Sequence, residues 1–355
     1  MQDIKITLSE KRNPKPKDES KLGFGSIFTD HMFLMNYNRD NGWHDPRIVP
    51  FGSLLISPAA MCLHYGQEVF EGLKAYRTKE NDILLFRPDK NMARMNASNE
   101  RLCIPPIDED FCVNAIKKLV SVDKDWVPSL EGTSLYIRPF IIGMDSQLGV
   151  HPANELLFVV ICSPVGAYYP EGLNPVKIYV EPNYVRAVKG GIGFAKTGGN
   201  YAASLKAQDE AGKQNYTQVL WLDGVNRKYV EEVGTMNVFF KIGNEIVTPA
   251  LEGSILPGIT RMSAIELLKS MGYKVSERKI SIDEIVDAYN KGNLKEAFGT
   301  GTAAVISPIG QLKYGDIIMN INNGKIGDVS QMLYDTLTDI QWGKIKDNFG
   351  WTTKI

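Results

Sequence analysis

The stretch VEEVGTMNVFF, residues 230–240, joins a pair of acidic residues to a strongly apolar run. The apolar and β-branched residues predict a buried β-strand, with Glu231 and Glu232 at its head beside Gly234. Paired acids at the end of a strand are most often solvated. The alternative is that one of them points inward, where a buried carboxylate needs a cationic partner such as a protonated pyridine nitrogen.

Strands and helices are interleaved around this stretch without strict strand–helix–strand alternation. Apolar, β-branched and aromatic runs predict strands at 83–86, 134–140, 156–161, 177–180 and 218–222, and a hairpin over 236–247 with Gly243-Asn244 at its turn. Helical spacing predicts helices at 92–103, 110–122, 201–208, from Pro257-Gly258 to near Gly272, from Ser281, where Glu284 completes a capping box, and at 329–344. The mixture predicts a two-domain enzyme of mixed α and β class.

The segment SPVGAYYPEGLNPVK, residues 163–177, holds three prolines and two glycines and is the best candidate for a domain boundary. We therefore expect four regions. They are a polar N-terminal arm at 1–20, a small N-terminal domain at 21–163, an interdomain loop at 164–176 and a larger C-terminal domain at 177–355.

The composition is that of an ordinary globular protein, with 43% hydrophobic and 23% charged residues among 355. The net charge of −1 favours neither nucleic acid nor an anionic membrane as a partner. The N-terminal arm has no apolar signal core, which indicates a cytoplasmic protein. The four cysteines form no Cys-x-x-Cys pair and the four histidines show no metal-ligand spacing, so we expect reduced, buried thiols and no metal site.

A lysine stands in an unusual setting in GFAKTGGNYAAS, residues 193–204. Lys196 lies between the apolar pair Phe194-Ala195 and a Gly-Gly turn, and a helical stretch follows it. Although most lysines are solvated, one in a partly dry pocket loses its charge readily, because burial disfavours the ammonium form. A neutral lysine amine is a nucleophile that can form a Schiff base.

Three further features are suited to holding a phosphate. Pro257-Gly258 opens a helix whose first N–H groups can bind an anion. FGTGTAAVISP, residues 298–308, is a Gly/Thr turn and not a dinucleotide fingerprint, because β-formers rather than a helix follow it. Arg94 lies on a helix after Arg87-Pro88, and its planar fork can clamp a phosphate. A well-capped helix, a structural turn and a solvated ion pair are the alternatives. With the lysine and the acid, these features form the set that pyridoxal phosphate requires.

The sequence resembles the branched-chain amino acid aminotransferases, which are pyridoxal-phosphate enzymes of fold type IV. The resemblance covers the chain from about Phe24 to the last helix. It is carried by LHYGQEVFEGLKAY (63–76), LFRPDKNMARM (85–95), SLYIRP (134–139), GGNYAAS (198–204), EVGTMN (232–237), ILPGITR (255–261) and FGTGTAA (298–304). It implies a D-amino acid aminotransferase-like fold, with a small N-terminal α/β domain and a larger C-terminal domain built on a pseudo-barrel of strands.

The resemblance also implies the role of each site residue. Lys196 matches the lysine that binds pyridoxal 5′-phosphate and moves the proton, and Glu232 rather than Glu231 matches the acid on the ring nitrogen. The other cofactor positions are Arg94, Ile259, Thr260 and Thr302 for the phosphate, and Tyr201 and Thr235 for the ring. Five substrate positions form an aromatic wall: Phe24, Tyr65, Phe70, Tyr136 and Tyr168. Arg138 matches the arginine for the second carboxylate of glutamate, and Thr302-Ala303 matches the site for the α-carboxylate. Leu148 and Val150 match a loop that reaches the neighbouring subunit.

The implied reaction is reversible transamination of L-leucine, L-isoleucine and L-valine with 2-oxoglutarate by a homodimer. The alternatives are a D-amino acid aminotransferase, a lyase of the aminodeoxychorismate type, and a non-catalytic interaction protein on the same scaffold. The chain departs from some relatives at Ala304 and Ser307, where they carry a Cys-x-x-Cys pair. Thiol-based control at that point is therefore absent from this chain.

Overall fold

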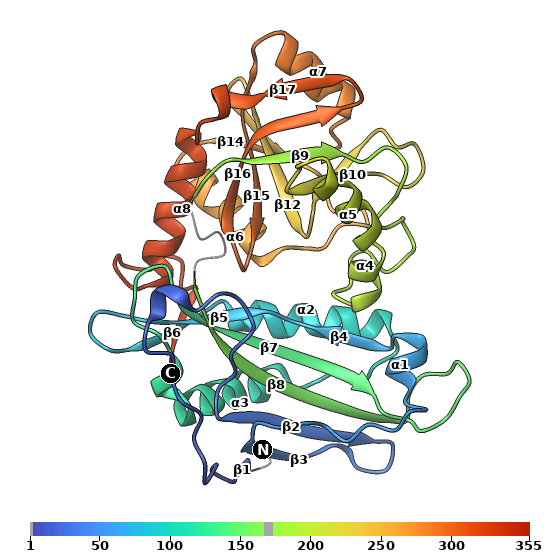
Figure 1. Cartoon of the computed structure of the whole chain (residues 1–355), viewed down its shortest axis with the longest axis vertical. Coiled ribbons are helices and arrows are strands. Elements are labelled where there is room, and N and C mark those ends of the chain that lie inside the picture. Colours follow the sequence, from blue (N-terminus) through green and yellow to red (C-terminus); the bar gives the residue numbers. More distant parts are fainter. Residues whose placement is uncertain (1–2, 167–172) are drawn as a thin grey trace. The chain divides into compact units, whose positions relative to one another are not determined.

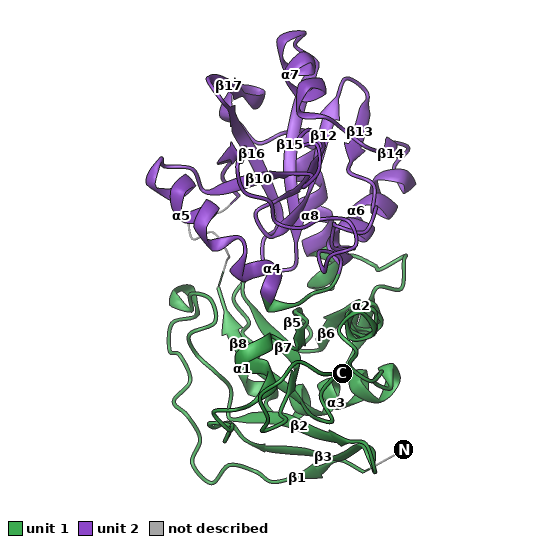
Figure 2. Cartoon of the chain, turned by 90° about the vertical axis from the view of Figure 1, so that its right-hand side faces the viewer, with its two compact units in different colours: residues 1–168, 195–198, 339–355 green, residues 169–194, 199–338 purple. Residues whose placement is uncertain are grey.

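The computed structural model describes residues 3–166 and 173–355, which form two compact units (Figures 1 and 2). Unit 1 comprises Met1–Tyr168, Ala195–Gly198 and Asp339–Ile355, and unit 2 comprises Tyr169–Phe194 and Gly199–Thr338. The short segment with Lys196 therefore belongs to unit 1, although it follows the predicted boundary at 164–176.

Unit 1 is built on a nine-stranded sheet with the order β1-β3-β2-β8-β7-β5-β6-β18, and β4 pairs with β7 (Figure 1). Its neighbouring strands are antiparallel except for the parallel β1–β3 pair. The strands are β1 (Lys5–Ile6), β2 (His31–Asn38), β3 (Gly42–Pro50), β4 (Glu68–Phe70), β5 (Leu73–Arg77), β6 (Ile83–Phe86), β7 (Ser134–Gly143), β8 (Glu155–Val165) and β18 (Thr352–Lys354).

Two helices share the hydrophobic core of this sheet. The helices of unit 1 are η1 (Glu19–Lys21), α1 (Met61–Tyr65), α2 (Pro88–Arg101), α3 (Glu109–Val122) and η2 (Lys124–Trp126). Along α3, Cys112, Ala115, Ile116 and Leu119 recur at helical spacing and are fully buried, so this face packs on the sheet as its sequence predicts. The predicted helices at 92–103 and 110–122 are confirmed, with starts shifted toward the N-terminus.

Unit 2 contains a closed barrel of six strands. Its sheet has the order β11-β10-β9-β16-β15-β12-β13-β14, and an additional pairing of β11 with β12 closes the ring. This confirms the predicted barrel-like core. The strands are β9 (Val176–Val180), β10 (Gln218–Leu222), β11 (Val230–Val233), β12 (Met236–Ile242), β13 (Glu245–Thr248), β14 (Lys274–Glu277), β15 (Leu294–Gly301), β16 (Val305–Tyr314) and β17 (Ile317–Asn320).

The helices of unit 2 agree with the sequence prediction except after Lys196. They are α4 (Gly198–Ala202), α5 (Leu205–Lys213), α6 (Ile259–Ser270), α7 (Ile282–Asn290), η3 (Ile321–Gly324) and α8 (Asp328–Gln341), of which α4 begins and α8 ends in unit 1. The predicted cap at Ser281 is confirmed, because its hydroxyl accepts the Glu284 N–H at 3.1 Å. The reciprocal half of the capping box is not seen among the described residues, since the Glu284 carboxylate pairs with Arg278 at 2.6 Å. The single helix predicted at 201–208 was wrong. Ser204 turns back on Tyr201 through its N–H and its hydroxyl, and such local bonds compete with helix continuation.

The cysteines agree only in part with expectation. All four are free thiols; Cys112 and Cys162 are buried as expected, whereas Cys62 is half-buried and Cys103 is exposed. Among residues 3–166 and 173–355, no helix has the length and apolarity needed to cross a membrane.

A buried carboxylate from the barrel holds the start of α8. Glu296 on β15 is 5% exposed and accepts the N–H groups of Val329 and Ser330 at 3.1 and 3.0 Å. Its oxygens also accept the Ser330 hydroxyl at 3.0 Å and Lys241 Nζ at 3.4 Å. A Cβ at Gly327 would lie 2.0 Å from this carboxylate, so only glycine fits there. Glu296 thus acts as the N-cap of a helix that is remote in sequence.

We expect Glu296→Ala to lower the free energy of unfolding by about 2 kcal/mol, because several buried donors lose their acceptor. This corresponds to a drop in Tm of roughly 4–8 °C, measurable by circular dichroism. Glu296→Gln keeps one acceptor oxygen and the side-chain shape, and its loss should be smaller. An alanine variant that melts with the native protein would show that α8 does not depend on this cap.

Candidate active site

The backbone of the segment with Lys196 is fixed on both sides. The Lys196 carbonyl accepts the N–H of Phe70 on β4 at 3.0 Å, and the Lys196 N–H donates to the Ser98 hydroxyl on α2 at 2.9 Å. The next turn is held by Gly198, whose N–H donates to the Glu68 carboxylate. The root of the lysine side chain therefore has a defined position against unit 1.

The amine of Lys196 lies among residues that the resemblance assigned to the substrate pocket. Its Nζ is 4.6 Å from the centroid of the Phe70 ring, and the Arg138 guanidinium is 4.8 Å from the same centroid. Arg138 also lies over the Tyr136 ring at 5.3 Å and donates to the Tyr136 hydroxyl at 3.2 Å. Phe24 packs edge-on against Tyr136, with 5.1 Å between centroids. The rings therefore place an amine and a guanidinium on one apolar surface.

Tyr65 lies with the loop that carries Leu148 and Val150. Its hydroxyl accepts the N–H of Gly149 at 2.9 Å. Leu148 is 65% exposed and Val150 is 82% exposed. The remaining member of the predicted wall, Tyr168, lies outside the described residues.

Glu68 is a residue of this region that the sequence analysis missed. It accepts from Gly198 N–H and from the Thr197 hydroxyl, the latter at 3.4 Å. Burial raises the pKa of the Glu68 carboxyl, and the nearby bonds and the charges of Arg138 and Lys196 offset only part of this rise. A signal for it was present, because side chains two apart on a strand share a face. Assigning Phe70 to the pocket also assigns Glu68.

The predicted phosphate arginine is held by a second missed acid. Arg94 on α2 is 8% exposed, and its Nε and Nη2 donate to the two oxygens of Glu71 at 2.7 and 2.8 Å. Asn91 donates to the same carboxylate at 2.7 Å. Glu71 is fully buried, so this two-point pair sets the plane of the guanidinium.

Both acids at the head of the VEEVGTMNVFF stretch are buried, which excludes the solvated alternative. Glu232 is 3% exposed and Glu231 is 7% exposed. Glu232 is paired with Arg186, whose Nε lies 2.9 Å from Oε2 in the geometry of an ion pair rather than of an aligned hydrogen bond. Its Oε1 accepts the Leu256 N–H at 2.9 Å. Glu231 turns to a different partner and accepts the Ser254 hydroxyl.

The start of α6 is tied to Glu232 through Asn237. Asn237 Nδ2 donates to the Leu256 carbonyl at 2.9 Å and to Glu232 at 3.4 Å. A Cβ at Gly258 would lie 1.9 Å from Asn237 Oδ1, so the close approach requires glycine. Gly258 is the N-cap of α6 and supplies no side-chain cap, which leaves the first turn to backbone N–H groups. Ile259 and Thr260 therefore begin a helix suited to an anion.

The strand register brings the two threonine turns to one end of the barrel. Glu232 pairs with Asn237 across β11–β12, and Asn237 pairs with Thr300 across β12–β15. Thr235 and Thr302 lie in the turns just beyond these ends of β12 and β15. β16 follows the second turn directly, which confirms that 298–308 is not a dinucleotide fingerprint.

The predicted site residues thus fall into two groups, one in each unit. Unit 1 carries Lys196, Arg94, Phe24, Tyr65, Phe70, Tyr136, Arg138, Leu148 and Val150. Unit 2 carries Glu232, Thr235, Ile259, Thr260, Thr302 and Ala303, with Tyr201 half-buried on α4.

A model of the amino-transferase class IV family matches residues 68–312 of the chain. The chain belongs to this family. The enzyme is 59% identical to branched-chain-amino-acid aminotransferase 2 of Bacillus subtilis, over 100% of this chain and 97% of that protein. It is 55% identical to a probable branched-chain-amino-acid aminotransferase of Staphylococcus aureus, over 100% of this chain and 99% of that protein.

Solved structures agree with the fold. The T.th. branched-chain amino acid aminotransferase with pyridoxamine 5′-phosphate is similar to the enzyme with a TM-score of 0.77 and 28% identity, over 92% of this chain and 99% of that one. The Escherichia coli branched-chain amino acid aminotransferase has a TM-score of 0.74 and 27% identity, over 91% and 98%. The fold and family expected from the sequence are confirmed.

We expect Glu68→Gln to change how the stability of the enzyme depends on pH. Because the pKa of Glu68 is raised in the folded state, the folded protein holds this proton more tightly than the unfolded chain. The native protein therefore loses stability as pH rises from the ordinary pKa of a glutamate through the raised one, and the glutamine variant lacks this loss. The difference in Tm should favour the variant more at pH 8 than at pH 5.

The matched control is Glu80→Gln, because Glu80 is an exposed acid of the same unit. Thermal scans of the native protein and the two variants at both pH values make the comparison. If Glu68→Gln and Glu80→Gln shift Tm by the same amount at both pH values, the pKa of Glu68 is not raised by burial.

Proposed function

We propose that the enzyme transfers the amino group of L-leucine, L-isoleucine and L-valine reversibly to 2-oxoglutarate, with pyridoxal 5′-phosphate bound to Lys196. The observation that carries the proposal is the placement of the Lys196 amine and the Arg138 guanidinium over one aromatic ring, Phe70. This arrangement supplies a nucleophilic nitrogen, an apolar wall for a branched side chain and a cation for a second carboxylate. The full-length likeness to branched-chain aminotransferases supports it.

The residues present fit the cofactor. When bound, pyridoxal phosphate supplies an aldehyde for a covalent link to an amine and a ring that withdraws electrons from the substrate's α-carbon. Glu232 is a buried carboxylate with its own cationic partner, which suits it to a protonated ring nitrogen. The α6 start, without a side-chain cap, suits a phosphate. Neighbours solved with pyridoxamine 5′-phosphate and with N-(5′-phosphopyridoxyl)-L-glutamate support this choice.

Each group then has a role. Arg94, Ile259, Thr260 and Thr302 hold the phosphate, and Tyr201, Glu232 and Thr235 hold the ring. Lys196 Nζ binds the cofactor and moves the proton at the substrate's α-carbon as a general base and acid. Its fixed backbone supports this role, because proton transfer depends on a defined distance.

The substrate residues divide by chemistry. Phe24, Tyr65, Phe70, Tyr136 and Tyr168 bury the branched side chain, and the Thr302-Ala303 turn binds the α-carboxylate. Arg138 binds the second carboxylate of glutamate and of 2-oxoglutarate. One set of side chains therefore binds both kinds of substrate. The aromatic rings bury the branched side chain, and the Arg138 guanidinium, which stacks on Phe70 and Tyr136, binds the second carboxylate.

We also propose a cytoplasmic homodimer in which Leu148 and Val150 contact the neighbouring subunit. Their exposure supports this, since large apolar side chains on an exposed loop gain from burial in an interface. Light scattering on a size-exclusion column should give twice the chain mass of 39.6 kDa. Leu148→Asp should shift the enzyme toward the monomer, and a native protein that elutes as a monomer would contradict the proposal.

A panel of amino donors with 2-oxoglutarate tests the proposed reaction. L-leucine, L-isoleucine and L-valine should each give glutamate, and D-alanine should not. Turnover of D-alanine would favour a D-amino acid aminotransferase, and product formation without 2-oxoglutarate would favour a lyase. Borohydride reduction and peptide mapping should label Lys196, and the variant Lys196→Ala should lose both the label and turnover.

We expect Arg138→Ala to lower kcat/KM for glutamate and 2-oxoglutarate by roughly 10–100-fold, because a hydrogen-bonded charge partner is lost. The loss for leucine should stay within a few-fold. Arg138→Met is the matched control, because its long side chain keeps the packing on Phe70 and Tyr136 without the charge. Equal losses for leucine and glutamate in the methionine variant would contradict the assignment.

A further inference from the structure

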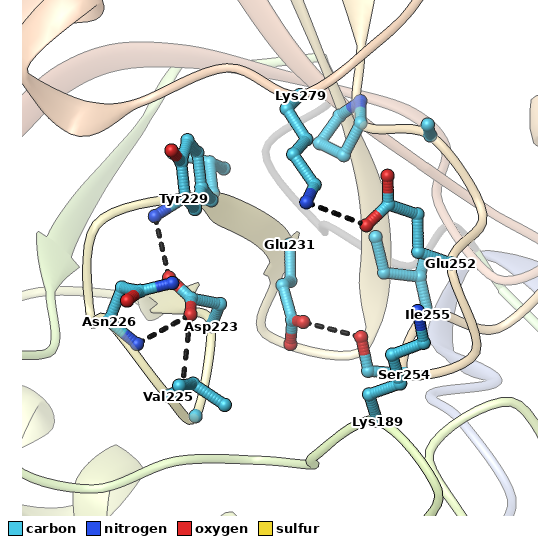
Figure 3. A pocket seen from close by; sticks show the side chains of 14 residues that line it. Lys189, Asp223, Val225, Asn226, Tyr229, Glu231, Glu252, Ser254, Ile255 and Lys279 are labelled. Atoms are coloured by element: carbon cyan, nitrogen blue, oxygen red, sulfur yellow. Dashed lines mark hydrogen bonds and ion pairs between the residues drawn. The ribbon is translucent and has the colours of Figure 1, made fainter.

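A pocket of about 200 Å³ lies within unit 2, between the loop 223–229 and the segment 249–255 (Figure 3). Its lining combines ionisable groups with apolar side chains, among them Val225, Pro249 and Ile255. Figure 3 shows the Glu231 carboxylate between this loop and Ser254. No residue assigned to the cofactor or substrate lines it.

Glu231 presents an acceptor that the protein does not use. Its Oε1 accepts the Ser254 hydroxyl, whereas Oε2 is buried and has no hydrogen-bond partner in the described part of the chain. The residue is 7% exposed, and burial raises the pKa of its carboxyl. A buried acceptor left unpaired destabilises the fold, so a donor that reaches the Glu231 carboxylate from the pocket would relieve this cost.

The other acids of the pocket already have partners. Asp223 accepts the N–H groups of Lys228 and Tyr229 at 2.9 and 2.8 Å, and two further N–H groups of the same loop. Glu252 is paired with Lys279 at 3.0 Å, and Lys279 also lies over the Tyr229 ring (Figure 3). Neither carboxylate competes with Glu231 for a ligand.

Of the two lysines that line the pocket, one has no ion pair within the described part of the chain and could bind an anion. Lys279 is taken by Glu252, whereas Lys189 has no ion pair with any acid among residues 3–166 and 173–355. Lys189 is exposed and lines the pocket, so its ammonium remains for an anion. The pocket therefore offers one acidic group, one basic group and several apolar side chains.

We propose that this pocket binds a small zwitterion, with a primary ammonium group on the Glu231 carboxylate and a carboxylate on Lys189. An ammonium supplies the missing donor and neutralises the buried charge, and the carboxylate pairs with the exposed lysine. A short carbon chain covers Val225, Pro249 and Ile255. The volume suits a molecule of amino-acid size.

Calorimetric titration of the cofactor-loaded enzyme tests the proposal with three probes: 4-aminobutyrate, butylammonium and butyrate. 4-Aminobutyrate carries both groups and has no α-amino group that could make it an ordinary donor. It should bind more tightly than either of the others. Glu231→Gln should weaken 4-aminobutyrate and butylammonium by tenfold or more. Lys189→Gln should weaken 4-aminobutyrate and butyrate but leave butylammonium unchanged.

Glu252→Gln is the control for a change of charge at the rim, and it should affect the three probes less than Glu231→Gln does. A crystal of the native enzyme soaked in 4-aminobutyrate gives a readout that does not depend on any variant. Density for the probe between Glu231 and Lys189 would support the proposal. A single water on Oε2 in the soaked crystal, or equal affinities in the native protein and Glu231→Gln, would overturn it.

Discussion

The hydrogen bond from Phe70 N–H to the Lys196 carbonyl is the constraint on which the position of Lys196 in unit 1 depends. It attaches a segment of four residues, Ala195–Gly198, to strand β4 across more than a hundred residues of sequence. The bond to Ser98 holds the same segment from α2, and the bond to Glu68 holds it from the first residue of β4. A lysine at the end of a free loop would sample many positions. The backbone of Lys196 has one fixed position, and its side chain extends along the aromatic ring of Phe70.

The barrel applies a similar constraint to the acids of unit 2. Closure of β11 on β12 buries both Glu231 and Glu232, so each must find partners within the protein or on a ligand. Arg186 and the Leu256 N–H meet this need for Glu232, and Asn237 links it to the start of α6. The Asn237 side chain therefore positions two features at once. These are the start of α6, which has no side-chain cap, and the Glu232 carboxylate, which is paired with Arg186.

Local features of this structure could be predicted from the sequence, whereas the partners of the site residues could not. The Gly243-Asn244 hairpin and the Ser281 cap depend on neighbours within a few residues, and both are confirmed. Glu71 and Glu68 were missed because their partners Arg94 and Gly198 lie 23 and 130 residues away in sequence. Only the folded sheet brings such pairs together. The break between α4 and α5 was missed for a different reason, because a serine that bonds to the preceding turn has the same pattern as one that continues a helix.

The alternation of side chains along β11 explains how adjacent acids have separate partners. Neighbouring residues of a strand face opposite sides, so Glu232 meets Arg186 while Glu231 meets Ser254 and the pocket. Both acids nevertheless bond to the same stretch of backbone. The Ser254 hydroxyl donates to Glu231 and the Leu256 N–H donates to Glu232, and these two residues lie two apart on the segment that leads into α6. The two acids thus hold neighbouring points of one segment from opposite faces of the strand, which fixes the approach of the chain to α6.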